Sequence, residues 1–284
     1  MAGVISSGVI VSVYSAVMVM SMWTLKVSAG LLLLPIIGML TALLAIIPGL
    51  VISRLFEFSS PQTGSFTCGA MLSNIGLTLG GFLSYSLLGE AGLSYSIVYS
   101  SFSMPFYFVV CFYVASLFAE ERRHGIMENL KLSFMRPSGF IPILSMAMGF
   151  ALNVMGFERP HLLGTVNQVF AYMTSFFLLF ASGLTFDFRM IRVYRKEALS
   201  MFPIKFLYNP LMGMGLVYLL KGKMNDPLLT KVVFIESVTP VAVFALLLPQ
   251  FFKLDQDLVN ATWVFTTGVF ILMIPLIMLV LDLL

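Results

Sequence analysis

Long apolar stretches follow one another along the whole of this 284-residue chain, and few folds outside a lipid bilayer can accommodate them. A bilayer core takes about 20 apolar residues per helix, and nine such stretches lie between polar segments. They cover residues 4–23, 27–52, 63–88, 91–118, 139–157, 161–187, 199–220, 227–251 and 256–283. Only 10% of the residues are charged, against about 25% in an ordinary soluble domain. We therefore predict an all-α polytopic membrane protein with about nine transmembrane helices.

Positive charges are distributed unevenly between the two sides of these spans. Alternate loops place ten Lys and Arg residues on one side (54, 122, 123, 131, 136, 189, 192, 195, 196 and 253) and four on the other (26, 159, 221 and 223). Cytoplasmic loops carry the excess of positive charge. We therefore expect an integral protein of the plasma (inner) membrane, with its N-terminus and loop 119–138 in the cytoplasm and its C-terminus outside. The first stretch has no basic residue before it, so we expect it to remain as a span.

Loop 119–138 separates a half with four spans from a half with five. Leu34-Pro35-Ile36 resembles Phe202-Pro203-Ile204, and Ser73-Asn74 has a counterpart in Thr239-Pro240 at a similar offset. We therefore predict two repeats, 1–118 and 139–284, in which the first has lost its first helix. An odd number of helices per ancestral repeat makes the two repeats inverted in the membrane.

Spans 63–88 and 227–251 are the least hydrophobic at their centres. The first surrounds Ser73-Asn74 with glycines, and the second carries Glu236, Ser237 and Thr239 before Pro240. Glycine and proline interrupt helices, and backbone groups freed in lipid need protein or water as partners. Paired interrupted helices in two inverted halves indicate a transporter's binding site. We therefore expect the two spans to break near Asn74 and Pro240 and to cross.

Several polar side chains are candidates for this site. For substrate binding they are Ser73, Asn74, Thr78, Asn209, Thr239 and Pro240, the last through freed carbonyls. For ion coupling they are Glu236 and Ser237. The serine and threonine hydroxyls could instead bond their own helix.

Glu236 is the only acidic residue near the middle of a span, where a carboxylate costs about 2.5 kcal/mol or more. We expect no basic residue to lie as deep as Glu236. A proton, a sodium ion or donors such as Asn74 are therefore the candidates that would compensate its charge. Lys205 is expected to extend to the cytoplasmic face rather than contact substrate. No other metal and no cofactor are expected.

The order of the motifs resembles the auxin efflux carrier family. SNIGLTLGGF resembles its Gly-Asn-x-Gly crossover motif, and ESVTPVAVFALLLPQFFKLDQDLVNATWVFTTGVFILMIPL resembles its last two helices. The resemblance implies a ten-helix fold of two inverted five-helix repeats with crossing helices, shared with bile-acid sodium symporters. The chain departs from the family pattern at Gly80-Gly81, where the family usually has a proline.

These features favour a secondary transporter for a small organic anion or auxin-like carboxylate, working by alternating access. The alternatives are a sodium-coupled symporter of the bile-acid type and, outside transport, a membrane receptor or scaffold. An enzyme is not expected, because neither His124 nor His161 lies at membrane depth. The net charge of +3 gives no reason to expect a nucleic-acid partner. The lipid bilayer and the anion are the expected partners, and a homodimer stays open.

Overall fold

The computed structural model describes residues 8–26, 28–119, 137–183, 189–220 and 226–284, and these residues form an all-α protein. The helices of the first half are η1 (Ile10–Tyr14), α2 (Ser15–Trp23), η2 (Ala29–Leu33), α3 (Leu34–Leu44), α4 (Ile46–Leu55), α5 (Ser60–Met71), α6 (Leu79–Tyr99), α7 (Ser103–Phe106), η3 (Tyr107–Cys111) and α8 (Phe112–Leu117). Those of the second half are α10 (Pro137–Val154), α11 (His161–Gly183), α12 (Arg189–Val193), α13 (Arg195–Pro203), η4 (Ile204–Tyr208), α14 (Asn209–Leu219), α15 (Pro227–Ser237), η6 (Val243–Leu247), α16 (Leu248–Phe252) and α17 (Gln256–Leu283). The predicted all-α class is confirmed.

Three helical segments are long and apolar enough to cross a membrane, judged by length and composition. They are Gly30–Leu55, Leu79–Leu117 and Gln256–Leu283. On the last of these, Leu272 and Leu283 are more than four-fifths exposed, as side chains that face lipid are. A helix with apolar residues on its outer face belongs in a bilayer rather than in water. The count of nine spans, the inverted repeats and the orientation stay predictions, and most of loop 119–138 lies outside the described residues.

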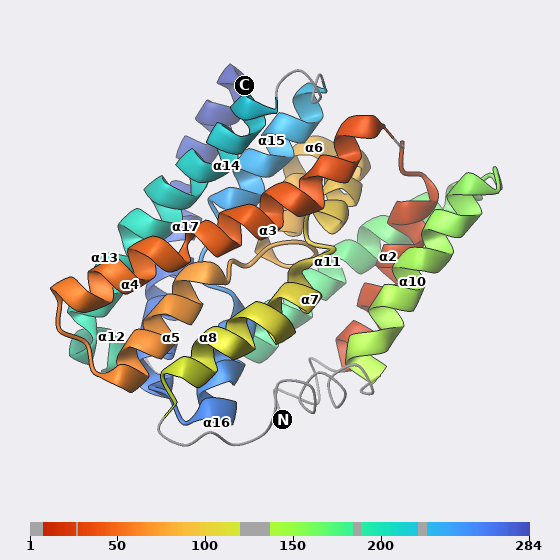
Figure 1. Cartoon of the computed structure of the whole chain (residues 1–284). Helices are drawn as coiled ribbons and strands as arrows, with labels where there is room; N and C mark the ends of the chain where they lie inside the picture. The colour runs from red at the N-terminus through yellow and green to blue at the C-terminus, as the bar shows by residue number, and fades with distance from the viewer. Residues whose placement is uncertain (1–7, 27, 120–136, 184–188, 221–225) are drawn as a thin grey trace.

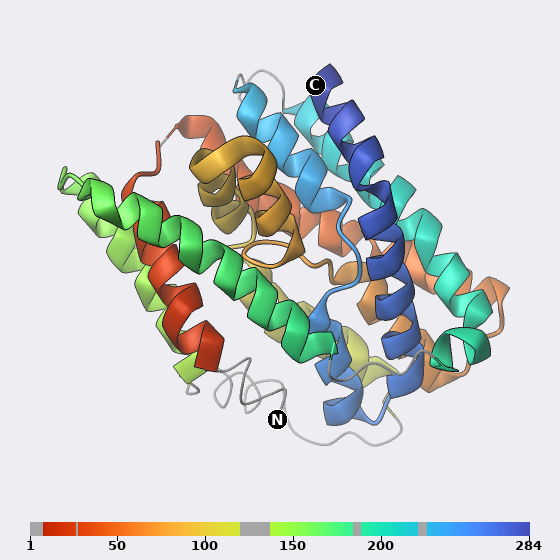
Figure 2. The same ribbon diagram turned by 180° about the vertical axis from the view of Figure 1, so that it is seen from behind.

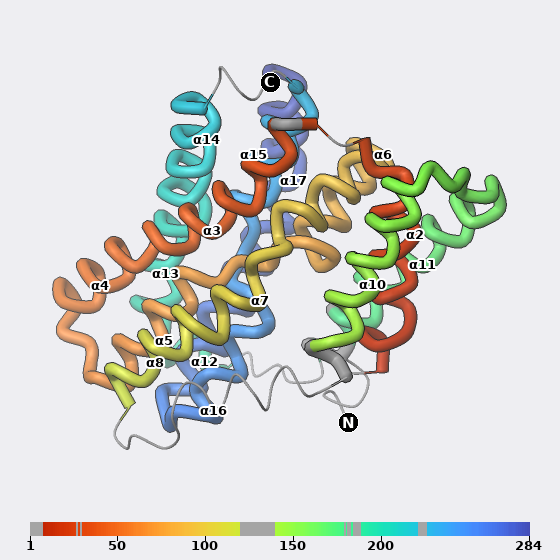
Figure 3. Tube along the Cα trace, turned by 45° about the vertical axis from the view of Figure 1, so that its right-hand side comes forward, coloured from red at the N-terminus to blue at the C-terminus, as the bar shows by residue number. Residues whose placement is uncertain are grey.

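The helices form two groups. Helix α2 packs against both α10 and α11, and these three helices form what we call the three-helix unit. The unit lies at one side of the molecule, on the right in Figure 1 and on the left when the view is reversed in Figure 2. Its main contacts with the remaining helices run through α6, which packs against both α2 and α11. Figure 3 shows the same separation along the Cα trace.

Both of the spans that were expected to be interrupted are interrupted. Helix α5 begins with a capping box, in which Ser59 and Gln62 satisfy each other's backbone N–H groups, and ends at Met71. Helix α6 starts only at Leu79. Helix α15 begins after an Asp226 cap and ends at Ser237, and the chain becomes helical again at Val243. The predicted breaks at Asn74 and Pro240 are therefore confirmed.

The boundary between spans 63–88 and 91–118 differs from the prediction. Helix α6 runs through it with a kink at Gly89, whose φ of 69° lies in the left-handed region. Glycine adopts this conformation without the steric cost that other residues meet. The direction of the chain therefore changes at one residue, with no intervening loop.

Candidate functional site: the crossing of two interrupted helices

The two breaks lie directly against each other. Ser73 and Val241 form an isolated antiparallel bridge. Its two hydrogen bonds run from Asn74 N to the Pro240 carbonyl and from Ala242 N to the Leu72 carbonyl, both at 2.9 Å. We call residues 72–78 and 238–242 together the crossing. Strand-like pairing of this kind satisfies backbone groups that neither helix can satisfy alone.

The α5 break leaves two amide groups in need of acceptors. In a continuous helix, Asn74 N–H would donate to Ala70 and Gly76 N–H to Leu72. Here Asn74 donates to Pro240 instead, and Gly76 N donates to Oε2 of Glu236 at 2.9 Å. The other oxygen of Glu236 accepts from the hydroxyl of Ser96. The carboxyl group of Glu236, which is fully buried, therefore replaces the carbonyl that would accept from Gly76 in a continuous helix.

Glu236 needs the glycine at position 80. A Cβ atom built on Gly80 would lie 2.7 Å from Cδ of Glu236, well inside the contact distance of two carbon atoms. Gly80 lies in the first turn of α6, where the helix dipole favours a negative charge. Gly80 therefore has a local role, because the absence of a side chain there admits the carboxyl group.

The same break leaves the carbonyl groups of Ala70 and Leu72 without their helical partners. The amine of Lys205 donates to both, at 2.8 and 2.9 Å, and lies 2.9 Å from Oγ of Ser73. Lys205 has no exposed surface. The expectation that it extends to the cytoplasmic face is wrong, and so is the expectation that no basic residue lies as deep as Glu236. Its stem runs inward because the end of α5 offers the amine oxygen partners that lipid lacks.

Two buried amides at the crossing keep unpaired atoms. Asn74 and Asn209 are each 2% exposed, and neither Nδ2 of Asn74 nor Oδ1 of Asn209 has a hydrogen-bond partner. Asn209 lies between Lys205 and Gly213 on one face of η4 and α14. Lys205 contacts Ser73, and Cβ built on Gly213 would lie 3.0 Å from Ser237, so Asn209 faces the crossing. Native proteins rarely bury an unpaired donor or acceptor without a reason.

The other candidate residues lie at the crossing with their polar atoms already engaged. The hydroxyl of Thr78 donates to the carbonyl of Ile75, that of Ser237 to Phe234 and that of Thr239 to Glu236, at 2.8–2.9 Å. Each hydroxyl therefore bonds a carbonyl three residues earlier in the chain, which is the alternative to substrate binding that the sequence left open. The Pro240 carbonyl accepts from Asn74. Of the donors considered for Glu236, Asn74 does not bond it, and Gly76 and Ser96 supply those bonds.

A metal ion at Glu236 would have to share oxygens that already accept hydrogen bonds. Within the described ranges, no three His, Cys, Asp or Glu residues gather as a metal site would require. The sodium ion or proton expected at Glu236 stays a prediction.

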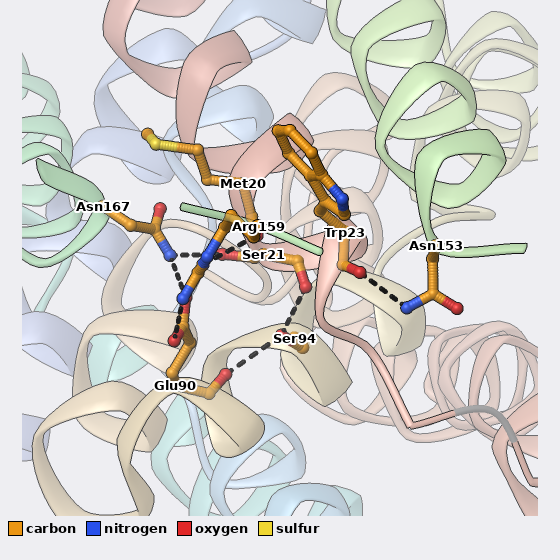
Figure 4. A network of polar contacts seen from close by, with 8 residues as sticks. All are labelled: Met20, Ser21, Trp23, Glu90, Ser94, Asn153, Arg159 and Asn167. Atoms are coloured by element: carbon orange, nitrogen blue, oxygen red, sulfur yellow. Dashed lines mark hydrogen bonds and ion pairs between the residues drawn. The ribbon is translucent and has the colours of Figure 1, made fainter. Parts of the chain in front are cut away.

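A second polar network joins the three-helix unit to α6 (Figure 4). Arg159, just before α11, forms a two-pronged ion pair with Glu90. Asn167 of α11 donates to the Glu90 carboxylate at 2.7 Å and to Oγ of Ser21 at 3.0 Å. Ser94 donates to the Ser21 carbonyl at 2.9 Å. Planar guanidinium–carboxylate pairs of this kind fix orientation as well as adding energy.

An open cleft of about 750 Å³ lies beside this network, lined among others by Trp23, Tyr85, Glu90, Arg159 and His161. The residues come from both groups of helices. Sequence reasoning placed Arg159 in a loop and His161 away from membrane depth, and Glu90 was not among the candidate site residues. Their pairing had no local signal, because Glu90 and Arg159 are 69 residues apart.

No family model matches the chain. A curated protein of Methanothermobacter thermautotrophicus named "uncharacterized transporter" is 24% identical over 251 residues, which are 87% of this chain and 78% of that protein. The match extends over both halves of the chain but does not establish a family for it.

Proposed function

We propose that this chain is a secondary transporter that carries a small organic anion through the crossing of α5–α6 and α15–α16. The observation that supports the proposal most directly is the pair of interrupted helices. Their freed backbone groups meet beside the side chain of Asn74, whose buried Nδ2 has no hydrogen-bond partner. The similarity to a protein named as a transporter supports it independently. The order of the sequence motifs leads us to place the chain with the auxin efflux carriers.

The chemistry of the crossing suits a carboxylate. Asn74 Nδ2 is a buried donor without a partner. The Lys205 ammonium beside Ser73 has its three N–H groups engaged but has no acidic partner among the described residues. An amide donor near an uncompensated positive charge suits a carboxylate. Asn209 Oδ1 would accept from a hydroxyl or protonated group elsewhere on the same substrate. Asn74 and Asn209 are closed off from solvent, so a substrate reaches them only after the surrounding helices move.

Glu236 is the residue that we propose for ion coupling. Its carboxyl group accepts from Gly76 inside the first break and from Ser96 of α6, so its position depends on the break and on the helix that follows it. Binding of a proton or a sodium ion would weaken these bonds and change the relative position of α6 and α15. Coupling to a gradient needs a step of this kind, in which one ligand alters the state that binds the other.

Flux measurements test the proposal. The purified protein in liposomes should accumulate or release labelled organic acids, such as mono- and dicarboxylates and an indole carboxylate, faster than liposomes without protein. Parallel runs with sodium, pH and potential gradients separate a sodium-coupled symporter of the bile-acid type from a proton-coupled or potential-driven carrier. Saturable binding without flux under every gradient would refute transport and favour a receptor.

A matched pair of variants ties the flux to the crossing. Asn74→Ala removes the unpaired donor, and Asn153→Ala removes an amide of α10 that bonds the carbonyls of Trp23 and Leu25, away from the crossing. The proposal expects the first variant, and not the second, to raise the substrate concentration at half-maximal flux. Equal effects would place the site elsewhere.

A further inference from the structure

The end of α5 has the chemistry of a binding site for a monovalent cation. Three oxygens converge there, from the Ala70 and Leu72 carbonyls and the Ser73 hydroxyl. Carbonyls at the C-terminal end of a helix carry partial negative charge, and unwound carbonyls and half-helix C-termini coordinate cations in transporters. In this protein the amine of Lys205 occupies that position, 2.8–2.9 Å from all three oxygens.

The other interrupted helix ends differently. At the end of α15, the Phe234 carbonyl accepts from Ser237 and the Glu236 carbonyl accepts from Thr239. Hydroxyls of residues at and just after the end of α15 therefore satisfy its last carbonyls. At the end of α5, the Ser73 hydroxyl contacts Lys205 instead of capping a carbonyl. The two ends of the crossing are thus satisfied by different chemistry, and only the α5 end uses a charged group from another helix.

The position of Lys205 is built into the fold. Lys205 is the second residue of the π-helix η4, which begins directly after Pro203. The wider turn of a π-helix alters the direction in which its side chains leave the helix. Across the described part of the chain, no Asp or Glu forms an ion pair with it, although a buried charge usually has such a partner. Among the described residues, its hydrogen-bond partners are the oxygens that the break in α5 exposes.

We propose that Lys205 is a tethered cation, which fills an alkali-metal site at the end of α5 and leaves the crossing independent of a dissociable cation there. The oxygens match the three N–H groups of an ammonium in number. The consequence for coupling rests on the proposed function: if the chain transports, its sodium or proton dependence comes from Glu236 and not from the end of α5. Occupancy of the site itself is a property of the folded protein and does not depend on transport.

The test measures thermal unfolding of the purified protein in sodium, potassium, methylammonium or choline chloride at constant ionic strength. Wild type should have the same midpoint in sodium and potassium as in choline, because its site is filled. Lys205→Ala should unfold at a lower temperature in choline. Sodium, potassium or methylammonium should then raise its midpoint by a few degrees for each tenfold increase above the Kd.

Two further variants separate the charge from the space it fills. Lys205→Met fills most of the space with apolar atoms, so it should be destabilised but gain no midpoint from any cation. Glu236→Gln in the Lys205→Ala background should retain the cation response, since the response arises at the end of α5. A response that disappears with Glu236→Gln would assign it to the other site and overturn the proposal.

Measurements on wild type keep the proposal testable if Lys205→Ala does not fold. A wild-type midpoint that rises saturably with sodium or potassium, and keeps rising in Glu236→Gln, would mean that a dissociable cation binds apart from Glu236, and would refute it. A Lys205→Ala midpoint equally low in all four salts would also refute it. Because unfolding is the readout, a failure to transport any substrate leaves these outcomes unchanged.

Discussion

The bridge that Glu236 forms between α15 and α6 gives a quantitative prediction for two substitutions at one position. Glu236→Ala removes both bonds of the carboxyl group and leaves the buried amide of Gly76 without an acceptor. Hydrogen bonds to charged groups contribute about 1.5–3 kcal/mol each, so the loss is about 3–6 kcal/mol. Glu236→Gln keeps an acceptor for Gly76, and the Ser96 hydroxyl can rotate to accept from the new amide.

The cost of Glu236→Gln is therefore smaller. Each bond falls from the charged to the neutral class, a loss of about 1 kcal/mol, and removal of a buried charge returns part of that loss. We expect a net cost of between zero and about 2 kcal/mol. At about 2–4 °C per kcal/mol for a chain of this size class, the alanine variant should unfold roughly 6–24 °C below wild type, and the glutamine variant at most about 8 °C below.

Thermal unfolding in a mild detergent, followed by intrinsic fluorescence, measures both variants against one control. Ser86→Ala serves as that control, because Ser86 is exposed on α6 and bonds only the Phe82 carbonyl of its own helix. It should match wild type. If Glu236→Ala and Glu236→Gln unfold at the same temperature, the carboxyl group does not replace the missing helical acceptor, and the account of the crossing given above is wrong.

Three further predictions concern substrate, packing and orientation. Asn74→Ala should raise the substrate concentration for half-maximal flux about 10- to 100-fold, the loss of one charge-assisted bond, with ion dependence unchanged; a lost ion dependence would contradict the division of roles. A double-mutant cycle of Arg159→Gln and Glu90→Gln, read by unfolding, should give a coupling of about 0.5–3 kcal/mol, and strict additivity would show that the pair does not hold α6 to the three-helix unit. Single cysteines placed in loop 119–138 should be protected from an impermeant reagent in intact cells, whereas one at Leu284 should react, and the reverse pattern would invert the orientation.

The glycine and proline patterns of the two interrupted spans predict the breaks from the sequence alone, because backbone that cannot continue as a helix has a local signature in the sequence. Asn74 and Pro240 were found in this way, and their contact follows from the crossing of the two spans. Lys205 was misplaced because its distance from the end of a span says nothing about which oxygens lie beside it in space. Ser96 was missed because a serine in an apolar helix resembles every other serine there. The partners of a freed backbone group come from distant parts of the chain, so local patterns reveal the break but not what completes it.

The distance along the chain between the break in α5 and its partners has a consequence for synthesis. Ala70, whose carbonyl bonds Lys205, is synthesised 135 residues before that lysine. Gly76, whose amide bonds Glu236, is synthesised 160 residues before that glutamate. The first half of the protein therefore enters the bilayer before the residues that bond its freed backbone groups have been synthesised. Lipid has no groups that could bond them instead. Water or the insertion machinery has to shelter this segment until η4 and α15 arrive. A nascent chain that stops before residue 205 leaves the Ala70 and Leu72 carbonyls without the amine that bonds them in the finished protein.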